Sequence, residues 1–253
     1  MEDGIDQQWP EEAERPRRPV RHPPAFNVPG VILALVVAFA AVHALRTLLL
    51  GDVANTRVLV DFAFIPGCYG SLDAVCRFRA AGAGIWTPLT YAFLHGSWTH
   101  FGVNAIWLLA FGTPVARRFG PPRFLLFSAL GAVAGAAVFY FMNPALVAPM
   151  IGASGIVSAL MGGACRFAFS GPAGGLMPMN PRQPRASVRE ALTNRTVLIF
   201  IIVFFASNLA LIGSLGGLVA GGSDVAWQAH LGGFAFGFFG FPLFDPVTLR
   251  QER

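Results

Sequence analysis

A serine and a histidine in two separate apolar segments have the residue types of a nucleophile and its general base. The run GASG at residues 152–155 contains Ser154, and the run AHLGG at residues 229–233 contains His230. A serine hydroxyl becomes an effective nucleophile when a base takes its proton, and a histidine can then pass that proton to a leaving amine. Ionisable groups inside membrane segments are costly and indicate a functional site. The pair therefore predicts acyl-transfer chemistry in an apolar environment.

Each of the two residues also has a structural interpretation. A serine in a membrane helix commonly hydrogen-bonds its own backbone or a neighbouring helix, and a lone histidine can be a packed core residue. Their joint placement favours chemistry. Gly152 and Gly155 would let the backbone turn tightly into the helix and let a substrate strand approach. Ser154 begins that helix, so its free N–H groups and the positive end of its dipole would face a developing oxyanion.

A second set of polar residues lies in an earlier apolar segment. His100 and Asn104 are four residues apart, so they share one face of a helix, and both side chains can donate hydrogen bonds to an oxyanion. His95 precedes them and could join His100 and His230 around a metal ion. No acidic or cysteine ligand lies nearby in the sequence, and the HExxH pattern is absent. We therefore predict neither a metal nor a cofactor.

The composition is that of a polytopic membrane protein. Of 253 residues, 55% are hydrophobic and only 12% are charged, about half the share found in soluble domains, and the mean hydropathy is +0.58. The chain is basic, with 18 arginines, no lysine and an isoelectric point near 9.9. The arginines fall between apolar segments rather than forming a stripe with aromatic residues, so no nucleic-acid partner is expected.

The chain divides into two polar ends and an apolar middle. Residues 1–28 are charged and proline-rich, so a disordered tail is expected there, and residues 246–253 form a short second tail. Between them the pattern predicts an all-α fold of six apolar helices, most of them near the length of about 20 residues that crosses a hydrocarbon core. These segments are residues 30–50, 98–115, 124–142, 154–169, 196–219 and 225–244.

Arginine placement predicts the orientation of the six segments. The N-terminal tail, the loops after the second and fourth segments and the C-terminus together carry 14 arginines, whereas the opposite side carries four, all around the first loop, and none in the third or fifth loop. The positive-inside rule then puts both termini in the cytoplasm. Ser154 and His230 fall toward the same outer face, which the arginine distribution alone did not require.

Small residues would let the fourth and sixth segments approach closely. Ser154, Ser158 and Gly162 recur every four residues on one segment, and Gly233-x-x-x-Gly237 begins one turn after His230 on the other. Such patterns bring membrane helices into backbone contact. We expect this crossing to bring the serine hydroxyl to the imidazole.

These motifs together resemble those of the rhomboid family of intramembrane serine proteases. The matching residues are His95…His100-x-x-x-Asn104, Gly152-x-Ser154-Gly155 and Ala229-His230-x-x-Gly233-x-x-x-Gly237, in that order. The resemblance covers residues 29–245 and implies a six-helix rhomboid-like membrane domain. It implies a dyad of Ser154 as nucleophile and His230 as base. His100, Asn104 and the Ser154 amide would stabilise the oxyanion, and His95 and the four glycines of the last two motifs would be structural residues near the site.

The resemblance also implies a setting for the reaction. Rhomboid proteases cut transmembrane protein substrates near the outer face of the membrane, which places this chain in membrane lipid, as a multi-pass protein of a bacterial inner membrane. One alternative is a catalytically silent rhomboid-like protein that binds membrane clients without cutting them. A transporter that uses the histidines as a proton relay is disfavoured, because the inner halves of the segments contain almost no polar residues.

The chain departs from the family pattern at two positions. Trp86 is followed by Thr87, where many rhomboids have arginine, so the shape or lipid contact of the first outer loop is expected to differ. Ser158 stands where a tyrosine often stacks on the catalytic histidine. We therefore expect Phe234, or an aromatic residue of the fifth segment, to hold the His230 ring.

Cysteines and loops leave further alternatives open. Cys68 and Cys76 lie eight residues apart in the first outer loop, either as a disulfide or as two free thiols. Cys165, toward the cytoplasmic end of its segment, and His43 are expected to serve packing. The glycine-rich loop at residues 213–223, beside a phenylalanine-rich fifth segment, either gates substrate entry or only lets the chain turn.

Overall fold

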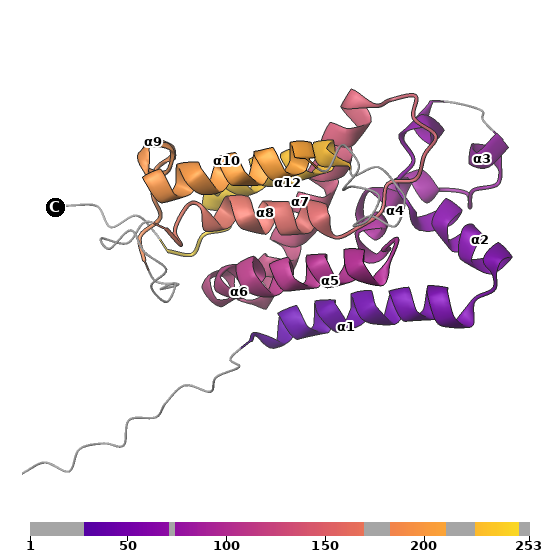
Figure 1. The fold of residues 1–253 in the computed structure, drawn as a ribbon, viewed down its shortest axis with the longest axis horizontal. Coiled ribbons are helices and arrows are strands. Elements are labelled where there is room, and N and C mark those ends of the chain that lie inside the picture. The colour runs from indigo at the N-terminus through magenta and orange to yellow at the C-terminus, as the bar shows by residue number, and fades with distance from the viewer. Residues whose placement is uncertain (1–27, 71–73, 170–182, 211–225, 248–253) are drawn as a thin grey trace, which may run out of the picture.

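The computed structural model describes residues 28–70, 74–169, 183–210 and 226–247. Over these residues the chain is helical without strands, apart from one antiparallel bridge between Phe64 and Met150. The longer helices lie lengthwise beside one another, with α2, α3 and α4 gathered at one end and α9 at the other (Figure 1). The α-helices are α1 (Gly30–Ala44), α2 (Asp52–Phe62), α3 (Ala74–Arg77), α4 (Ala83–Thr90), α5 (Trp98–Trp107), α6 (Thr113–Phe119), α7 (Pro121–Met142), α8 (Ser154–Ala164), α9 (Val188–Thr193), α10 (Arg195–Ala210) and α12 (Trp227–Gly240).

Each of the six expected apolar segments contains a helix, but the helices differ in length. The described residues include two helices that are long and apolar enough to cross a membrane, Gly30–Leu49 and Pro121–Met142, whereas α8 and α10 are shorter apolar helices. The second expected segment continues from α5 through the π-helical turn η4 (Leu108–Gly112) into α6. The expected N-terminal tail, the end of the fifth segment and the glycine-rich loop at residues 213–223 lie outside the described residues.

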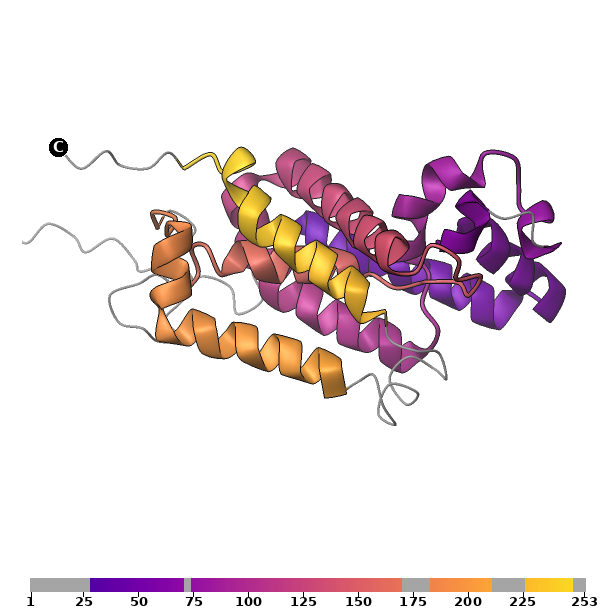
Figure 2. The ribbon, with the colours of Figure 1, turned by 90° about the horizontal axis from the view of Figure 1, so that it is seen from above.

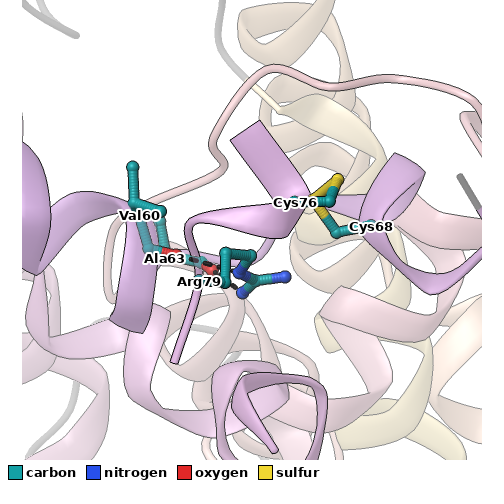
Figure 3. Close-up of a disulfide and its surroundings, with 5 residues drawn as sticks. All are labelled: Val60, Ala63, Cys68, Cys76 and Arg79. Carbon is teal, nitrogen blue, oxygen red and sulfur yellow. Dashed lines mark hydrogen bonds between the residues drawn. A yellow bond between two sulfur atoms is a disulfide. The ribbon is translucent and has the colours of Figure 1, made fainter. Parts of the chain in front are cut away.

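The stretch between the first two apolar segments is a small folded unit rather than a simple loop. It contains α2, α3 and α4, and a disulfide joins Cys68 to Cys76 (Figure 3). The Arg79 guanidinium donates to the carbonyl oxygens of Val60 and Ala63, at 2.9 and 3.0 Å. Of the two alternatives that the sequence left open, the structure contains the disulfide and not two free thiols.

Trp86 and Thr87, where the chain departs from the rhomboid pattern, lie on α4 inside this unit. The Trp86 indole N–H donates to the Asp61 carbonyl oxygen at 2.9 Å, and the buried Thr87 hydroxyl lies 3.4 Å from the Tyr69 hydroxyl. Tyr69 in turn donates to the Gly84 carbonyl oxygen. Thr87 therefore takes part in packing within the unit.

Helix α8 lies at the centre of the bundle, and its residues after Ser154 are all buried. Helices α7 and α12 pack along it, and α12 lies beside α7 and α8 when the bundle is viewed from above (Figure 2). Glycines make these contacts close: a Cβ on Gly131 of α7 would lie 2.5 Å from the Ala159 Cβ, and one on Gly237 of α12 would overlap the Ala159 carbonyl oxygen. The predicted close crossing of the fourth and sixth segments is present.

Two arginines at the expected cytoplasmic ends of the second and fourth segments are buried, Arg118 on α6 and Arg166 just after α8. Arg118 forms a two-pronged ion pair with Asp245, with both nitrogen–oxygen distances at 2.8 Å and both side chains fully buried. Arg166 donates to the carbonyl oxygens of Ala186 and Phe238. These two residues therefore tie loops to helices in addition to carrying charge.

Candidate active site

The extended segment before α8 sets the position of Ser154. Phe64 and Met150 exchange two backbone hydrogen bonds, at 3.1 and 2.8 Å, and the Gly152 N–H donates to the Tyr91 carbonyl oxygen at 3.0 Å. Gly152 has a φ of +123°, a conformation that side chains with a Cβ rarely adopt. The chain thus turns sharply at Gly152, and α8 begins two residues later at Ser154.

His230 lies in the first turn of α12, level with Ser154. A Cβ on Gly233 would overlap the Gly155 carbonyl oxygen, so the two helix backbones touch at this pair. Ser154 is the neighbour of Gly155, and His230 is about one turn before Gly233. Both side chains are half-buried, and α8 and α12 both begin at the end of the bundle that contains α2–α4 (Figure 1).

Within the part of the chain that the structure describes, no hydrogen bond joins Ser154 to His230. Catalytic hydrogen bonds are often long or poorly aligned in enzymes without substrate and shorten in the reactive complex. The structure thus places Ser154 and His230 on touching helices at one level. Their hydrogen bond would have to form when substrate binds.

His100 borders the same space as Ser154. A Cβ on Gly152 would lie 2.7 Å from His100 Nε2 and 3.8 Å from Ser154 Oγ, so both atoms face the position that this glycine leaves empty. The Gly96 N–H points at His100 Nδ1 at 3.4 Å. Because Nδ1 accepts there, the ring proton belongs on Nε2. His100 therefore presents an N–H donor beside the Ser154 hydroxyl.

Asn104 supports His100 from the next turn of α5. Its side chain is 5% exposed, and its Nδ2 donates to the His100 carbonyl oxygen at 2.9 Å. The Ser97 hydroxyl caps the helix by accepting from the His100 N–H at 3.0 Å. An amide nitrogen has two protons, so Asn104 keeps one donor for a ligand after this contact.

His95 is fully buried beside these residues. Its ring contacts those of His43, His100 and Phe101, and its carbonyl oxygen accepts from the Arg46 guanidinium at 3.1 Å. Burial lowers the pKa of His95 to about 3, which keeps the ring neutral at physiological pH. His43 is likewise buried, and its ring packs edge-on against Trp98 at 4.6 Å between centroids.

The His230 ring is held by a residue that the sequence interpretation missed. His230 Nδ1 is hydrogen-bonded to Oδ1 of Asn208 on α10. Of the two alternatives expected, Phe234 and an aromatic residue of the fifth segment, Phe234 stacks on Phe204 of that segment at 5.0 Å between centroids, beside the polar contact. The available signal was the polar amide of Asn208 in a mostly apolar segment, since polar groups there commonly bind another helix.

The described histidines do not form a group of metal ligands. Among the described residues, no three His, Cys, Asp or Glu side chains form a group that could hold a metal ion. The one free cysteine of the described chain, Cys165, is buried near the far end of α8, ten residues beyond Gly155. The arrangement around Ser154 therefore consists of a hydroxyl, imidazoles and amides.

Comparison with known proteins identifies the family. A model of the rhomboid domain matches residues 82–245, which include Ser154, His230 and the residues around them. The chain belongs to the rhomboid family. The match covers α4 to α12 and begins just before the segment that contains His95 and His100.

Individual rhomboids are similar over shorter stretches. RHOMBOID-like protein 12, mitochondrial, of Arabidopsis thaliana is 33% identical over 148 residues, which is 52% of this chain and 39% of that protein. Rhomboid protease GluP of Bacillus subtilis (strain 168) is 31% identical over 167 residues, which is 65% of this chain and 29% of that protein. Rhomboid-related protein 3 of Homo sapiens is 35% identical over 79 residues, which is 31% of this chain and 19% of that protein. The chain thus matches about two fifths or less of the length of these relatives.

Proposed function

We propose that this rhomboid is an intramembrane serine endopeptidase that cleaves transmembrane protein substrates with Ser154 and His230. The observation that supports the proposal is the backbone contact between Gly155 and Gly233, because Ser154 adjoins the first glycine and His230 lies about one turn before the second. The name of one relative, Rhomboid protease GluP, agrees with a proteolytic activity.

In the proposed reaction, Ser154 Oγ attacks the scissile carbonyl carbon while its proton passes to His230 Nε2. The imidazolium then gives this proton to the leaving amine nitrogen, which completes an acyl-enzyme. In the second half, water adds to the acyl carbonyl carbon while His230 takes its proton; His230 then returns the proton to Ser154 Oγ as the Oγ–acyl bond breaks, which releases the carboxylic acid product. No metal or cofactor takes part in these steps.

The developing oxyanion would be bound by three kinds of donor. His100 offers Nε2–H beside Ser154, Asn104 offers its remaining amide proton, and the Ser154 backbone N–H lies at the start of α8. Unpaired N–H groups and the helix dipole at that position favour negative charge. Each such donor is worth about 100-fold or more in turnover.

The proposed setting is a bacterial inner membrane crossed six times, with both termini in the cytoplasm and cleavage near the outer face. The Cys68–Cys76 disulfide supports an outer position for the unit formed by α2–α4, because disulfides persist in oxidising compartments. Helices α8 and α12, which carry Ser154 and His230 in their first turns, begin at that same end of the bundle.

The test uses the purified full chain in lipid vesicles with a model transmembrane substrate and a fluorophosphonate probe for reactive serines. Ser154→Ala and His230→Ala are expected to abolish cleavage, and Ser154→Ala to abolish labelling, while folding persists. Ser158→Ala is the matched control, since it removes a buried serine hydroxyl one turn further along α8 and should keep both signals. Cleavage by the Ser154→Ala protein, or binding of substrate by an unlabelled and inactive wild type, would refute the proposal; the latter would favour a client-binding rhomboid.

A further inference from the structure

We propose that Asn208 is a positioning residue for His230, so that the site works as a Ser–His–Asn arrangement rather than as a bare dyad. This inference rests on the proposed function. It starts from a contact between helices that are distant in sequence, the hydrogen bond between Asn208 Oδ1 on α10 and His230 Nδ1 on α12.

The orientation of the Asn208 amide follows from its second contact. Nδ2 of Asn208 lies 2.7 Å from the Phe204 carbonyl oxygen. A carbonyl oxygen only accepts, so the amide nitrogen must be the atom that faces it, and the amide oxygen must face the imidazole. The amide is therefore fixed with its acceptor toward His230.

The fixed acceptor selects one tautomer of the imidazole. An oxygen acceptor at Nδ1 requires that Nδ1 carry the proton, which leaves the lone pair of a neutral ring on Nε2. This is the tautomer that a general base needs when it takes a proton through Nε2, and the group that bonds Nδ1 also stabilises the imidazolium that forms. Asn208 can perform both tasks through one oxygen.

The packing around the pair makes the contact durable. Asn208 is 7% exposed. One turn away on each helix, Phe204 stacks on Phe234, and Phe205 meets the same ring at 5.6 Å between centroids. The aromatic contact fixes the separation of α10 and α12, and the polar contact lies directly beside it.

The first test reads the tautomer in the wild-type protein. Nitrogen-15 NMR of the histidine-labelled full chain, with the His230 signal assigned by its loss in His230→Ala, should show the Nδ1–H form at neutral pH. An Nε2–H form overturns the inference. This measurement does not depend on turnover, so its result stands apart from the outcome for the proposed function.

The second test uses turnover of the model transmembrane substrate. Asn208→Leu is expected to lower kcat about tenfold, the value of one hydrogen bond to an imidazole, with KM unchanged. Asn208→Asp keeps an acceptor in either charge state and should stay within about threefold of wild type. Ser207→Ala is the matched control, because the exposed Ser207 hydroxyl donates to the same Phe204 carbonyl oxygen at 2.8 Å; its kcat should not change.

These variants separate positioning from mere packing. Wild-type kcat in Asn208→Leu, or equal losses in Asn208→Leu and Asn208→Asp, would overturn the inference while leaving the Ser154–His230 proposal intact. Absence of turnover in the wild type would instead refute the proposed function.

Discussion

Replacing Gly152 with alanine tests whether the empty position beside Ser154 sets the oxyanion site. The new Cβ would lie 2.7 Å from His100 Nε2, where ordinary contact begins at 3.4 Å, so the ring must retreat by about 0.7 Å. The φ of +123° adds backbone strain of about 1–3 kcal/mol. Since a misplacement approaching 1 Å can cost about 100-fold, we expect kcat to fall about 100-fold.

Gly120→Ala separates the two effects of that substitution. Gly120 also has a positive φ, +73°, but a Cβ there would have no atom within 4 Å. Both variants should therefore lose about 1–3 kcal/mol of unfolding free energy, measured by thermal melting in detergent, and only Gly152→Ala should lose turnover. If Gly152→Ala cleaves the substrate at the wild-type rate, or if Gly120→Ala is equally impaired, the assignment of His100 as a donor beside Ser154 is wrong.

Three further variants test the scaffold through unfolding free energy and substrate turnover. Asp245→Ala removes the carboxylate from the buried Arg118 and should destabilise by about 3–5 kcal/mol; a loss under 1 kcal/mol would contradict the importance of the pair. Tyr91→Phe deletes a buried hydrogen bond to a carbonyl of α7 and should cost about 1 kcal/mol, with turnover kept within about threefold. Replacing both Cys68 and Cys76 with serine opens a short loop and should cost about 2.5 kcal/mol. Unchanged melting of this double variant would count against the disulfide.

The sequence predicted those parts of the fold that depend on periodicity and residue size. Helices occur in all six expected segments, and the spacing of Gly233 and Gly237 correctly indicated close packing against α8. The family expected from the motifs is confirmed by the match of the rhomboid domain. The helices and the close packing could be predicted because they depend on local sequence: a small residue at every fourth position makes a flat helix face wherever the partner helix lies.

The features that the sequence did not predict depend on distant contacts. The helices α2 to α4 were missed because a short amphipathic helix within a loop lacks the length that marks an apolar segment. Asn208 was missed because its role depends on how α10 is rotated against α12. The resemblance to rhomboids also favoured an aromatic residue at this place, since Ser158 stands where a ring often stacks on the histidine.

The two ends of the bundle use polar groups in different ways, and the difference suits the proposed chemistry. Arg118 and Asp245 are both fully buried and hold fixed opposite charges, which suits a permanent tie between loops and helices. A general base must instead gain and lose a proton in every turnover. A carboxylate beside His230 would bring a second ionisable group into a membrane segment, at a desolvation cost that an amide avoids. The neutral oxygen of Asn208 can orient the imidazole without that cost, which falls on folding rather than on turnover, so Asn208→Asp is expected to lower the unfolding free energy more than it lowers kcat.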